Sequence, residues 1–235
     1  MPLPHLSQPA AAGCNRLLVY LHGAGEVGGD TGRQLRKCGP WVDVLHDPTG
    51  TYAADTVAAM RRFHVLAFHL PDGDWDGAVL DADIAAWLDA HPGIDRERLY
   101  LTGVSRGGWG VLRLAIHRLR AGRQVTAVAA FCPAGGAKAY RNADLALLRQ
   151  VPVQLFHCPE DEVVPFEGSA TLHRRIGSAT SRLRIVHRSE LANPAGPHDC
   201  WTQFYGHPAF YRWLEQPARD PADWPHLPAG HAARG

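Results

Sequence analysis

The sequence has almost no net charge and no long apolar run. Its 24 lysines and arginines against 23 aspartates and glutamates leave a formal charge of +1, which favours neither nucleic acid nor an anionic membrane as a partner. The N-terminus lacks the basic segment and apolar core of an export signal, and no later stretch approaches the roughly 20 apolar residues of a membrane span. These absences predict a cytoplasmic protein that binds no nucleic acid and no membrane.

The cysteines and histidines also lack the spacing of a disulfide framework or a metal site. Five cysteines are an odd number, and none forms a C-x-x-C pair, so we expect reduced thiols. They are Cys14, Cys38, Cys132, Cys158 and Cys200. His64 with His69, and His157 with Cys158, do not have the paired spacing of metal ligands. We therefore predict no metal and no cofactor.

Length and composition predict one globular domain. A chain of 235 residues with 46% apolar and 20% charged residues can form one large hydrophobic core. Residues 1–15 are an N-terminal extension with no strong pattern, and the main domain covers residues 16–216. Residues 217–235 contain four prolines, which predicts an extended or disordered tail.

Short apolar runs alternate with helical patterns along the main domain. This alternation is typical of an α/β protein with a mainly parallel sheet, here of about six strands, between helices. The predicted strands are 16–21, 64–69, 98–104, 125–131, 151–157 and 183–187. Leu80, Ile84, Trp87 and Leu88 share one helical face, and so do Leu112, Ala115, Ile116 and Leu119. Further helices are expected near 139–149, 167–177 and 200–215.

Ser105 lies in the stretch TGVSRGGWG, where a predicted strand ends and a helix begins. A sharp turn there exposes the hydroxyl above the sheet edge, and Gly103 and Gly107 keep side chains out of the crowded corner. The N–H of Arg106 would then point to the place where an oxyanion forms. We interpret Ser105 as a nucleophile; the alternative is a glycine-rich turn without chemistry.

A serine nucleophile needs a base and an orienting carboxylate, and both residue types follow in the sequence. FHCPEDEVVP places Glu160, Asp161 and Glu162 just beyond a predicted strand, and GPHDCW places His198 in the loop after the next one. His187 and His207 are the nearest alternatives to His198. The chain order of serine, acid and histidine matches the order of a serine hydrolase triad.

The stretch LHGAGE follows the first predicted strand and offers a second oxyanion donor. A turn at His22-Gly23 leaves the N–H groups around Ala24 and Gly25 facing the point above Ser105. We interpret His22 as a structural residue of this turn, because its neighbours act through their backbone amides. All four segments would meet at the carboxyl ends of the strands, where open α/β sheets bind ligands.

Together, LHGAGE, TGVSRGGWG, FHCPEDEVVP and HDCWTQFYGHPAFYRWL resemble the alpha/beta-hydrolase superfamily. Within it, the chain is similar to the esterases and predicted peptidases related to polyhydroxybutyrate depolymerases and feruloyl esterases. The resemblance covers residues 16–216 and implies a three-layer alpha/beta-hydrolase fold as the catalytic domain. It also implies Ser105 as nucleophile, Asp161 as acid and His198 as base, with an oxyanion hole formed by the N–H of Arg106 and an N–H near Ala24 or Gly25.

The chain departs from these relatives in two places. They usually have methionine where this chain has Arg106, and they usually carry further strands before the HG motif, for which residues 1–15 leave little room. Arg106 either binds an anionic group of the substrate or pairs with Glu26, and the pairing is the simpler interpretation because a buried arginine needs a partner.

Aromatic residues near the expected crevice are candidates for a substrate pocket, although such residues are as often part of a core. They are Trp75, Trp109, Phe131, Phe166, Trp201 and Tyr205, and the substrate-binding residues we select are Trp75, Trp109, Phe166 and Trp201. The sequence thus predicts a serine esterase that acts on a small-molecule ester through an acyl-enzyme. A thioesterase, a peptidase and a silent ligand-binding homologue remain the alternatives.

Overall fold

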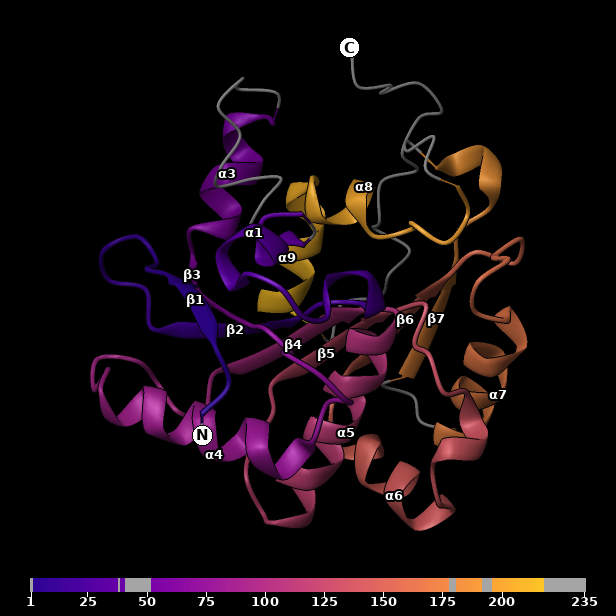
Figure 1. The fold of residues 1–235 in the computed structure, drawn as a ribbon, viewed down its shortest axis with the longest axis horizontal. Coiled ribbons are helices and arrows are strands. Elements are labelled where there is room, and N and C mark those ends of the chain that lie inside the picture. The colour runs from indigo at the N-terminus through magenta and orange to yellow at the C-terminus, as the bar shows by residue number, and fades with distance from the viewer. Residues whose placement is uncertain (1, 38, 41–51, 178–180, 192–195, 218–235) are drawn as a thin grey trace.

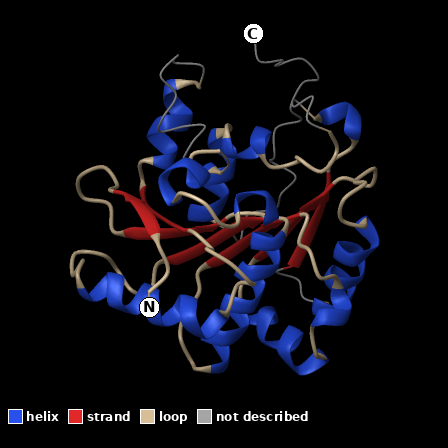
Figure 2. Ribbon diagram, viewed as in Figure 1, coloured by secondary structure: helices blue, strands red, loops and turns tan. Residues whose placement is uncertain are grey.

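The computed structural model describes residues 2–37, 39–40, 52–177, 181–191 and 196–217, and a single sheet runs through their centre (Figure 2). Seven strands lie in the order β1-β3-β2-β4-β5-β6-β7. Only β1 is antiparallel to its neighbour, β3, and all other pairs are parallel. The strands are β1 (His5–Gln8), β2 (Arg16–Leu21), β3 (Phe63–Phe68), β4 (Leu99–Val104), β5 (Ala127–Phe131), β6 (Val153–His157) and β7 (Ser181–Ile185).

The predicted mainly parallel sheet is confirmed, with seven strands in place of about six. Every predicted strand is present, with ends that differ by at most two residues. The additional strand is β1, which pairs His5 with Phe68 and Gln8 with Val65. Its four residues alternate between exposed and half-buried and contain no apolar run, so no sequence pattern indicates this short edge strand.

Helices connect the strands and cover both faces of the sheet. The α-helices are α1 (Thr31–Leu35), α3 (Ala54–Met60), α4 (Gly77–Asp89), α5 (Arg106–Arg120), α6 (Asn142–Leu147), α7 (Phe166–Ile176), α8 (Thr202–Tyr205) and α9 (Pro208–Glu215). Short 3₁₀ helices are η1 (Ala24–Glu26), η2 (Ala137–Ala139), η3 (Leu148–Gln150) and η4 (Arg188–Glu190). The helix predicted at 200–215 is split in two, because Pro208 has no N–H to continue α8 and instead begins α9.

The two faces of the sheet have separate hydrophobic cores. Leu17, Val19 and Leu21 of β2 point to one face and join apolar residues of α4, α5, α6 and α7. Leu18 and Tyr20 point to the other face and join residues of α3 and α9. Figure 1 shows α4, α5 and α6 below the sheet and α3 and α9 above it. The alternation of side chains along β2 therefore fixes the middle layer of a three-layer structure.

The strand order reverses direction at the centre of the sheet. The chain passes from β2 to β3 on one side, then returns across β2 to β4 and continues outward to β7. At such a reversal the loops after the two central strands separate, which opens a crevice at their carboxyl ends. The loop after β2 begins with His22, and the loop after β4 is Ser105, so two of the predicted motifs meet at this point.

No helix in the described part of the chain is both long and apolar enough to cross a membrane. The predicted tail at 217–235 lies outside the described residues, except for Pro217. Cys14, Cys132, Cys158 and Cys200 are free thiols, whereas Cys38 also lies outside the described residues.

Candidate active site

Ser105 forms the corner between β4 and α5 in a backbone conformation that few residues adopt. Its φ is 54° and its ψ is −116°, and among the described non-glycine residues only Cys132 also has a positive φ. The Ser105 N–H donates to the carbonyl of Phe131 at 2.8 Å, while the Ser105 carbonyl accepts from the N–H groups of Trp109 and Ala134. These bonds to β5 and α5 hold a strained turn, as is typical of functional sites.

Glycines allow this corner to pack against the neighbouring strand. A Cβ on Gly103 would lie 2.5 Å from the carbonyl oxygen of Gly107, and a Cβ on Gly107 would collide with the carbonyl oxygen of Leu21. Gly108 is equally confined, because its Cβ would lie 2.8 Å from the carbonyl oxygen of Phe131. The predicted need for Gly103 and Gly107 is confirmed, and its reason is backbone that approaches backbone.

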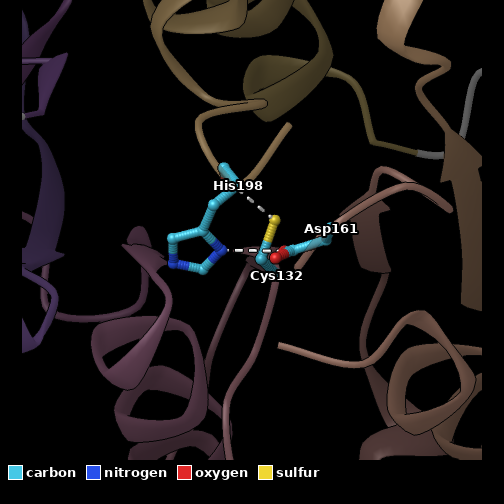
Figure 3. A group of neighbouring side chains, drawn as sticks. All are labelled: Cys132, Asp161 and His198. Carbon is cyan, nitrogen blue, oxygen red and sulfur yellow. Dashed lines mark hydrogen bonds and ion pairs between the residues drawn. The ribbon is translucent and has the colours of Figure 1, made fainter. Parts of the chain in front are cut away.

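His198 and Asp161 come together at the same edge of the sheet, as Figure 3 shows. The Nδ1 of His198 lies 2.8 Å from Oδ2 of Asp161. Asp161 follows β6, and His198 lies in the loop before α8. The carboxylate has no exposed side-chain surface, whereas the His198 side chain is 21% exposed. Within the described ranges, the other ring nitrogen of His198, Nε2, makes no hydrogen bond to the protein and can act toward solvent or a substrate.

Four donors surround the Asp161 carboxylate. The backbone N–H groups of Val163 and Val164 donate to Oδ1 at 2.8 and 2.9 Å, and His157 and His198 approach Oδ2. Burial by itself would raise the pKa of Asp161, but the hydrogen bonds from these imidazoles and amides hold that pKa well below its ordinary value. Asp161 is therefore a carboxylate throughout the neutral range.

The alternative acids point elsewhere. Glu160 accepts a hydrogen bond from the Cys158 thiol at 3.0 Å and lies at the surface beside His187, whose Nδ1 is 3.8 Å away. Glu162 is exposed and faces Arg188. Asp161 is the one of the three acids that contacts His198.

The environment of His198 makes it a stronger base than a free imidazole. Burial acts to lower the pKa of His198, but the hydrogen bond to Asp161 and contact with Cys132 outweigh burial and raise this pKa to about 9. The Trp201 ring meets the imidazole edge to face, with ring centroids 5.3 Å apart. The two alternatives to His198 have other surroundings. His187 is a surface residue, and His207 accepts a hydrogen bond from the N–H of Ala209 at the start of α9.

His22 fixes the turn that follows β2. The N–H of Leu70 donates to Nε2 of His22 at 3.0 Å, so the proton of the neutral ring is on Nδ1, which lies 2.7 Å from the Gly23 carbonyl. Burial lowers the pKa of His22 to about 4, which keeps the ring neutral. The interpretation of His22 as a structural residue agrees with these contacts.

The predicted oxyanion donors lie on either side of Ser105. A Cβ on Gly23 would lie 3.4 Å from Cβ of Ser105, so the turn that leads into η1 passes directly beside Ser105. Ala24 and Gly25 are exposed at the beginning of this 3₁₀ turn. Arg106 is the first residue of α5, and first-turn N–H groups have no acceptor within their own helix.

The side chain of Arg106 does not pair with Glu26. Its Nη1 donates to the Gly73 carbonyl at 3.0 Å, and its Nε lies 3.6 Å from Oδ1 of Asp74. The predicted pairing is therefore wrong: the guanidinium is 35% exposed and reaches outward to the loop after β3. Glu26 instead folds back over its own turn, where its Oε2 would lie 3.4 Å from a Cβ on Gly23, and burial raises the pKa of its carboxyl.

The four predicted pocket residues are in different environments. Trp75 is fully buried; its ring contacts Gly110 and His22, so it lies beneath the site and has no surface for a substrate. Trp109 is half-buried under the guanidinium of Arg113, 4.6 Å from the ring centroid, and Phe166 is half-buried beside His157. Of the four, Trp201 is the one whose ring contacts His198.

A thiol completes the group drawn in Figure 3. Ligand-type atoms of Cys132, Asp161 and His198 lie within 4.8 Å of one another, the arrangement of a small metal site. However, burial raises the pKa of the Cys132 thiol well above its ordinary value, and its Sγ lies 3.4 Å from the His198 carbonyl and 3.1 Å from Sγ of Cys200. A metal would have to displace the protons that both Cys132 and His198 hold tightly.

Solved structures of esterases have a similar fold. A thermostable esterase is similar with a TM-score of 0.67 and 23% identity over 91% of this chain, which spans only 59% of that protein. Esterase PE8 gives a TM-score of 0.59 and 24% identity, covering 87% of this chain and 98% of the esterase. Est1E from Butyrivibrio proteoclasticus gives 0.60 and 15%, covering 92% and 94%. No protein-family model and no curated protein matches the sequence.

Proposed function

We propose that this chain, which has the alpha/beta-hydrolase fold, is a serine hydrolase that cleaves carboxylic esters through an acyl-enzyme. The observation that carries the proposal is the 2.8 Å bond between His198 Nδ1 and Asp161 Oδ2 at the sheet edge where Ser105 forms a strained corner. A nucleophile, a base and an orienting acid at one crevice are the three groups that acyl transfer requires.

In this mechanism His198 removes the proton from Ser105 as the Oγ attacks the ester carbonyl. Asp161 keeps the proton of neutral His198 on Nδ1, so that Nε2 faces the serine, and then stabilises the imidazolium. His198 gives this proton to the leaving alcohol, which leaves the acyl group on Ser105. Water then attacks the acyl-enzyme as His198 removes its proton, and His198 returns that proton to Ser105 as the acid departs. The described residues show no hydrogen bond from Ser105 to His198, so this contact must form in the substrate complex, as is common for catalytic hydrogen bonds.

The oxyanion of the tetrahedral intermediate would accept hydrogen bonds from the backbone N–H of Arg106 and from an N–H near Ala24 or Gly25. Each donor of this kind contributes about 3 kcal/mol to the transition state. No metal or cofactor takes part in the proposed reaction, because the two amides and His198 supply all the charge stabilisation and proton transfer that it needs.

The substrate class in this proposal is a small-molecule carboxylic ester. Two of the structures with this fold are described as esterases, and a third, Est1E, is described with ferulic acid bound. An acylaminoacyl peptidase also has this fold. Trp201 beside His198 offers an aromatic wall for the acyl or alcohol group of such an ester.

The deciding experiment compares hydrolysis of p-nitrophenyl esters, from acetate to long acyl chains, by the wild type, by Ser105→Ala and by Ser181→Ala. Ser181 is a buried serine of β7 and serves as the matched control. We expect activity in the wild type and the control only, together with covalent labelling of Ser105 by a fluorophosphonate, located by peptide mass spectrometry. A folded wild type that neither hydrolyses esters nor is labelled would identify a ligand-binding protein instead. Turnover of thioesters or peptides above that of esters would change the substrate class and keep the mechanism.

A further inference from the structure

A second imidazole reaches the acid of the proposed triad from within the protein. His157 is the last residue of β6, and its side chain has no exposed surface. Its Nε2 lies 3.2 Å from Oδ2 of Asp161, the oxygen that His198 also contacts at 2.8 Å. Oδ2 of Asp161 therefore lies between two imidazoles, one buried in the sheet and one facing the crevice.

The neighbours of His157 define which of its nitrogens carries the proton. Its Nε2 lies 2.9 Å from the carbonyl of Val164 as well as 3.2 Å from Asp161. Both neighbouring atoms are acceptors, so Nε2 must be the donor. Nδ1 lies 2.7 Å from Oγ of Ser169 on α7. A neutral His157 satisfies every contact if the Ser169 hydroxyl donates to Nδ1 and the Nε2–H donates to the Val164 carbonyl and to Asp161.

We propose that His157 is a positioning residue, which holds the Asp161 carboxylate in the one orientation that serves His198. This inference rests on the proposed function. It describes a continuous chain of hydrogen bonds from Ser169 through His157 and Asp161 to His198, which then acts on Ser105. His157 touches neither the substrate nor the reacting atoms, and it acts only through Asp161.

The physical reason is the number of donors that a buried carboxylate requires. Val163 and Val164 donate to Oδ1, and His198 and His157 share Oδ2. Without the Nε2–H of His157, Oδ2 has one donor fewer and becomes a stronger acceptor for the imidazolium of His198. His198 then loses its proton only at higher pH, and a smaller fraction of the enzyme has a free base at neutral pH.

The groups that titrate near His198 are few among the described residues. Asp161 from the loop after β6 and Cys132 from the loop after β5 face it, and Asp161 in turn faces His157. Asp161 is ionised and Cys132 is protonated across the neutral range, because the pKa of the first is lowered and that of the second is raised. The acid limb of the pH profile of kcat/KM therefore reports on His198.

The chain offers matched variants for a test. His157→Gln keeps an N–H donor at the distance of Nε2, whereas His157→Leu removes it at similar volume. His173 is the control: it lies on α7, and its Nδ1 is 3.0 Å from Oγ of Ser181, so it forms the same kind of imidazole–serine pair away from Asp161. Ser169→Ala removes the donor to Nδ1 of His157 without changing the imidazole.

We would measure kcat and KM for a p-nitrophenyl ester as a function of pH. For His157→Leu we expect the acid limb of kcat/KM to move up by about one pH unit, which lowers activity at neutral pH roughly tenfold, with KM unchanged. His157→Gln restores the wild-type limb, Ser169→Ala shifts it upward by less, and His173→Leu leaves it in place. An unshifted limb in His157→Leu, or an equal shift in His157→Gln, would overturn the proposal.

A second measurement is independent of ester hydrolysis. The proton between His198 Nδ1 and Asp161 should give a resolved low-field NMR signal that changes with the titration of His198, and its midpoint should rise in His157→Leu. Should His157→Leu fail to fold, Ser169→Ala decides, and an unchanged midpoint in that variant counts against the proposal. If the wild type hydrolyses no ester but the midpoint moves as expected, the proposed function fails and the role of His157 stands.

Discussion

Two buried aspartates, Asp81 and Asp161, lie in different regions of the molecule and have different interaction partners. Asp81 is 5% exposed and lies on α4, where it contacts the guanidinium groups of Arg118 and Arg123 and, at 3.5 Å, the imidazole of His117. Asp161 as a whole residue is 9% exposed, although its side chain has no exposed surface, and it lies after β6. Two imidazoles and two backbone amides surround its carboxylate. Both carboxylates are satisfied by several donors, yet only one belongs to a candidate active site.

The difference lies in what the partners can do with a proton. A guanidinium stays charged at any pH that a protein experiences, so the contacts of Asp81 with Arg118 and Arg123 join α4 to α5 and to the turn after it without a change in protonation. An imidazole gains and loses its proton near neutral pH, so the contact between Asp161 and His198 sets the strength of a base. Burial of a carboxylate therefore identifies a functional site only when its partner titrates and faces a crevice.

The largest expected effect separates the two aspartates by activity. Asp161→Asn should lower kcat about 10⁴-fold, because an amide no longer keeps the proton of His198 on Nδ1. Asp81→Asn should leave kcat within about twofold of the wild type, since α4 contributes nothing to the proposed chemistry. Steady-state kinetics on one p-nitrophenyl ester checks both variants. A comparable loss in Asp81→Asn would remove the distinction.

Asp81→Asn should instead change the stability of the fold. Asp81→Asn leaves Arg118, whose side chain is only 7% exposed, without its counter-charge, and we expect the free energy of unfolding to fall by about 3 kcal/mol. Urea unfolding followed by circular dichroism measures this change as a lower midpoint with the same slope. An unchanged midpoint would mean that the Asp81 charge contributes nothing net to the stability of the fold.

A pH series sharpens the comparison because the proposed base, His198, contacts Asp161. His198 must be neutral to act as a base, so kcat/KM should rise about tenfold per unit as the pH increases toward the His198 pKa and level off near the raised value of about 9. A profile that levels off near the ordinary value of 6.5 would show that Asp161 does not stabilise the imidazolium in solution.

Folding stability should follow the same groups. Because the folded state raises the His198 pKa, its contribution is present below the ordinary value of 6.5 and is lost as the pH rises through about 9. The Asp161 pKa is lowered, so its contribution is present above the ordinary value of 3.8 and is lost as the pH falls. Thermal unfolding across this range measures both trends, and the alkaline loss should disappear in Asp161→Asn.

The smallest expected effect concerns Arg106, a partly exposed arginine in contrast to the buried Arg118. Its contact with Asp74 contributes at most about 1 kcal/mol, so Arg106→Met should change kcat/KM by no more than roughly fivefold. Because the guanidinium turns toward Gly73 and Asp74, we expect equal changes for neutral and carboxylate-bearing esters. A loss confined to the carboxylate-bearing esters would assign Arg106 to substrate binding.

The regions that the sequence predicted well are those where one residue type has one physical use. Buried parallel strands require short apolar runs, so β2, β4 and β6 were visible as runs. The corner at Ser105 requires glycine where backbones touch, and Gly103 and Gly107 mark it. His198 and Asp161 were found because their order along the chain and the position of strand ends restrict the choice.

The sequence failed where the folded path of the chain, and not a local pattern, selects the partner of a side chain. His157 is simply the last residue of an apolar strand, and only the loop that brings Asp161 back toward β6 gives it a partner. Arg106 was assigned to Glu26 because both flank Ser105, yet its side chain turns outward to Asp74. Trp75 follows a strand end as a pocket residue would, but it packs under His22 and against Gly110.

The sequence by itself determined the middle layer of the fold, the position of the strained serine and the identity of the candidate base. Each of these follows from local rules: the two-residue alternation of strands, the conformational freedom of glycine and the order of loops along the chain. Only the tertiary structure decided which donors surround Asp161, where Arg106 points and that residues 5–8 join the sheet. Those features depend on which surfaces meet after folding, and hydrogen bonds between elements distant in sequence leave no periodic trace along the chain.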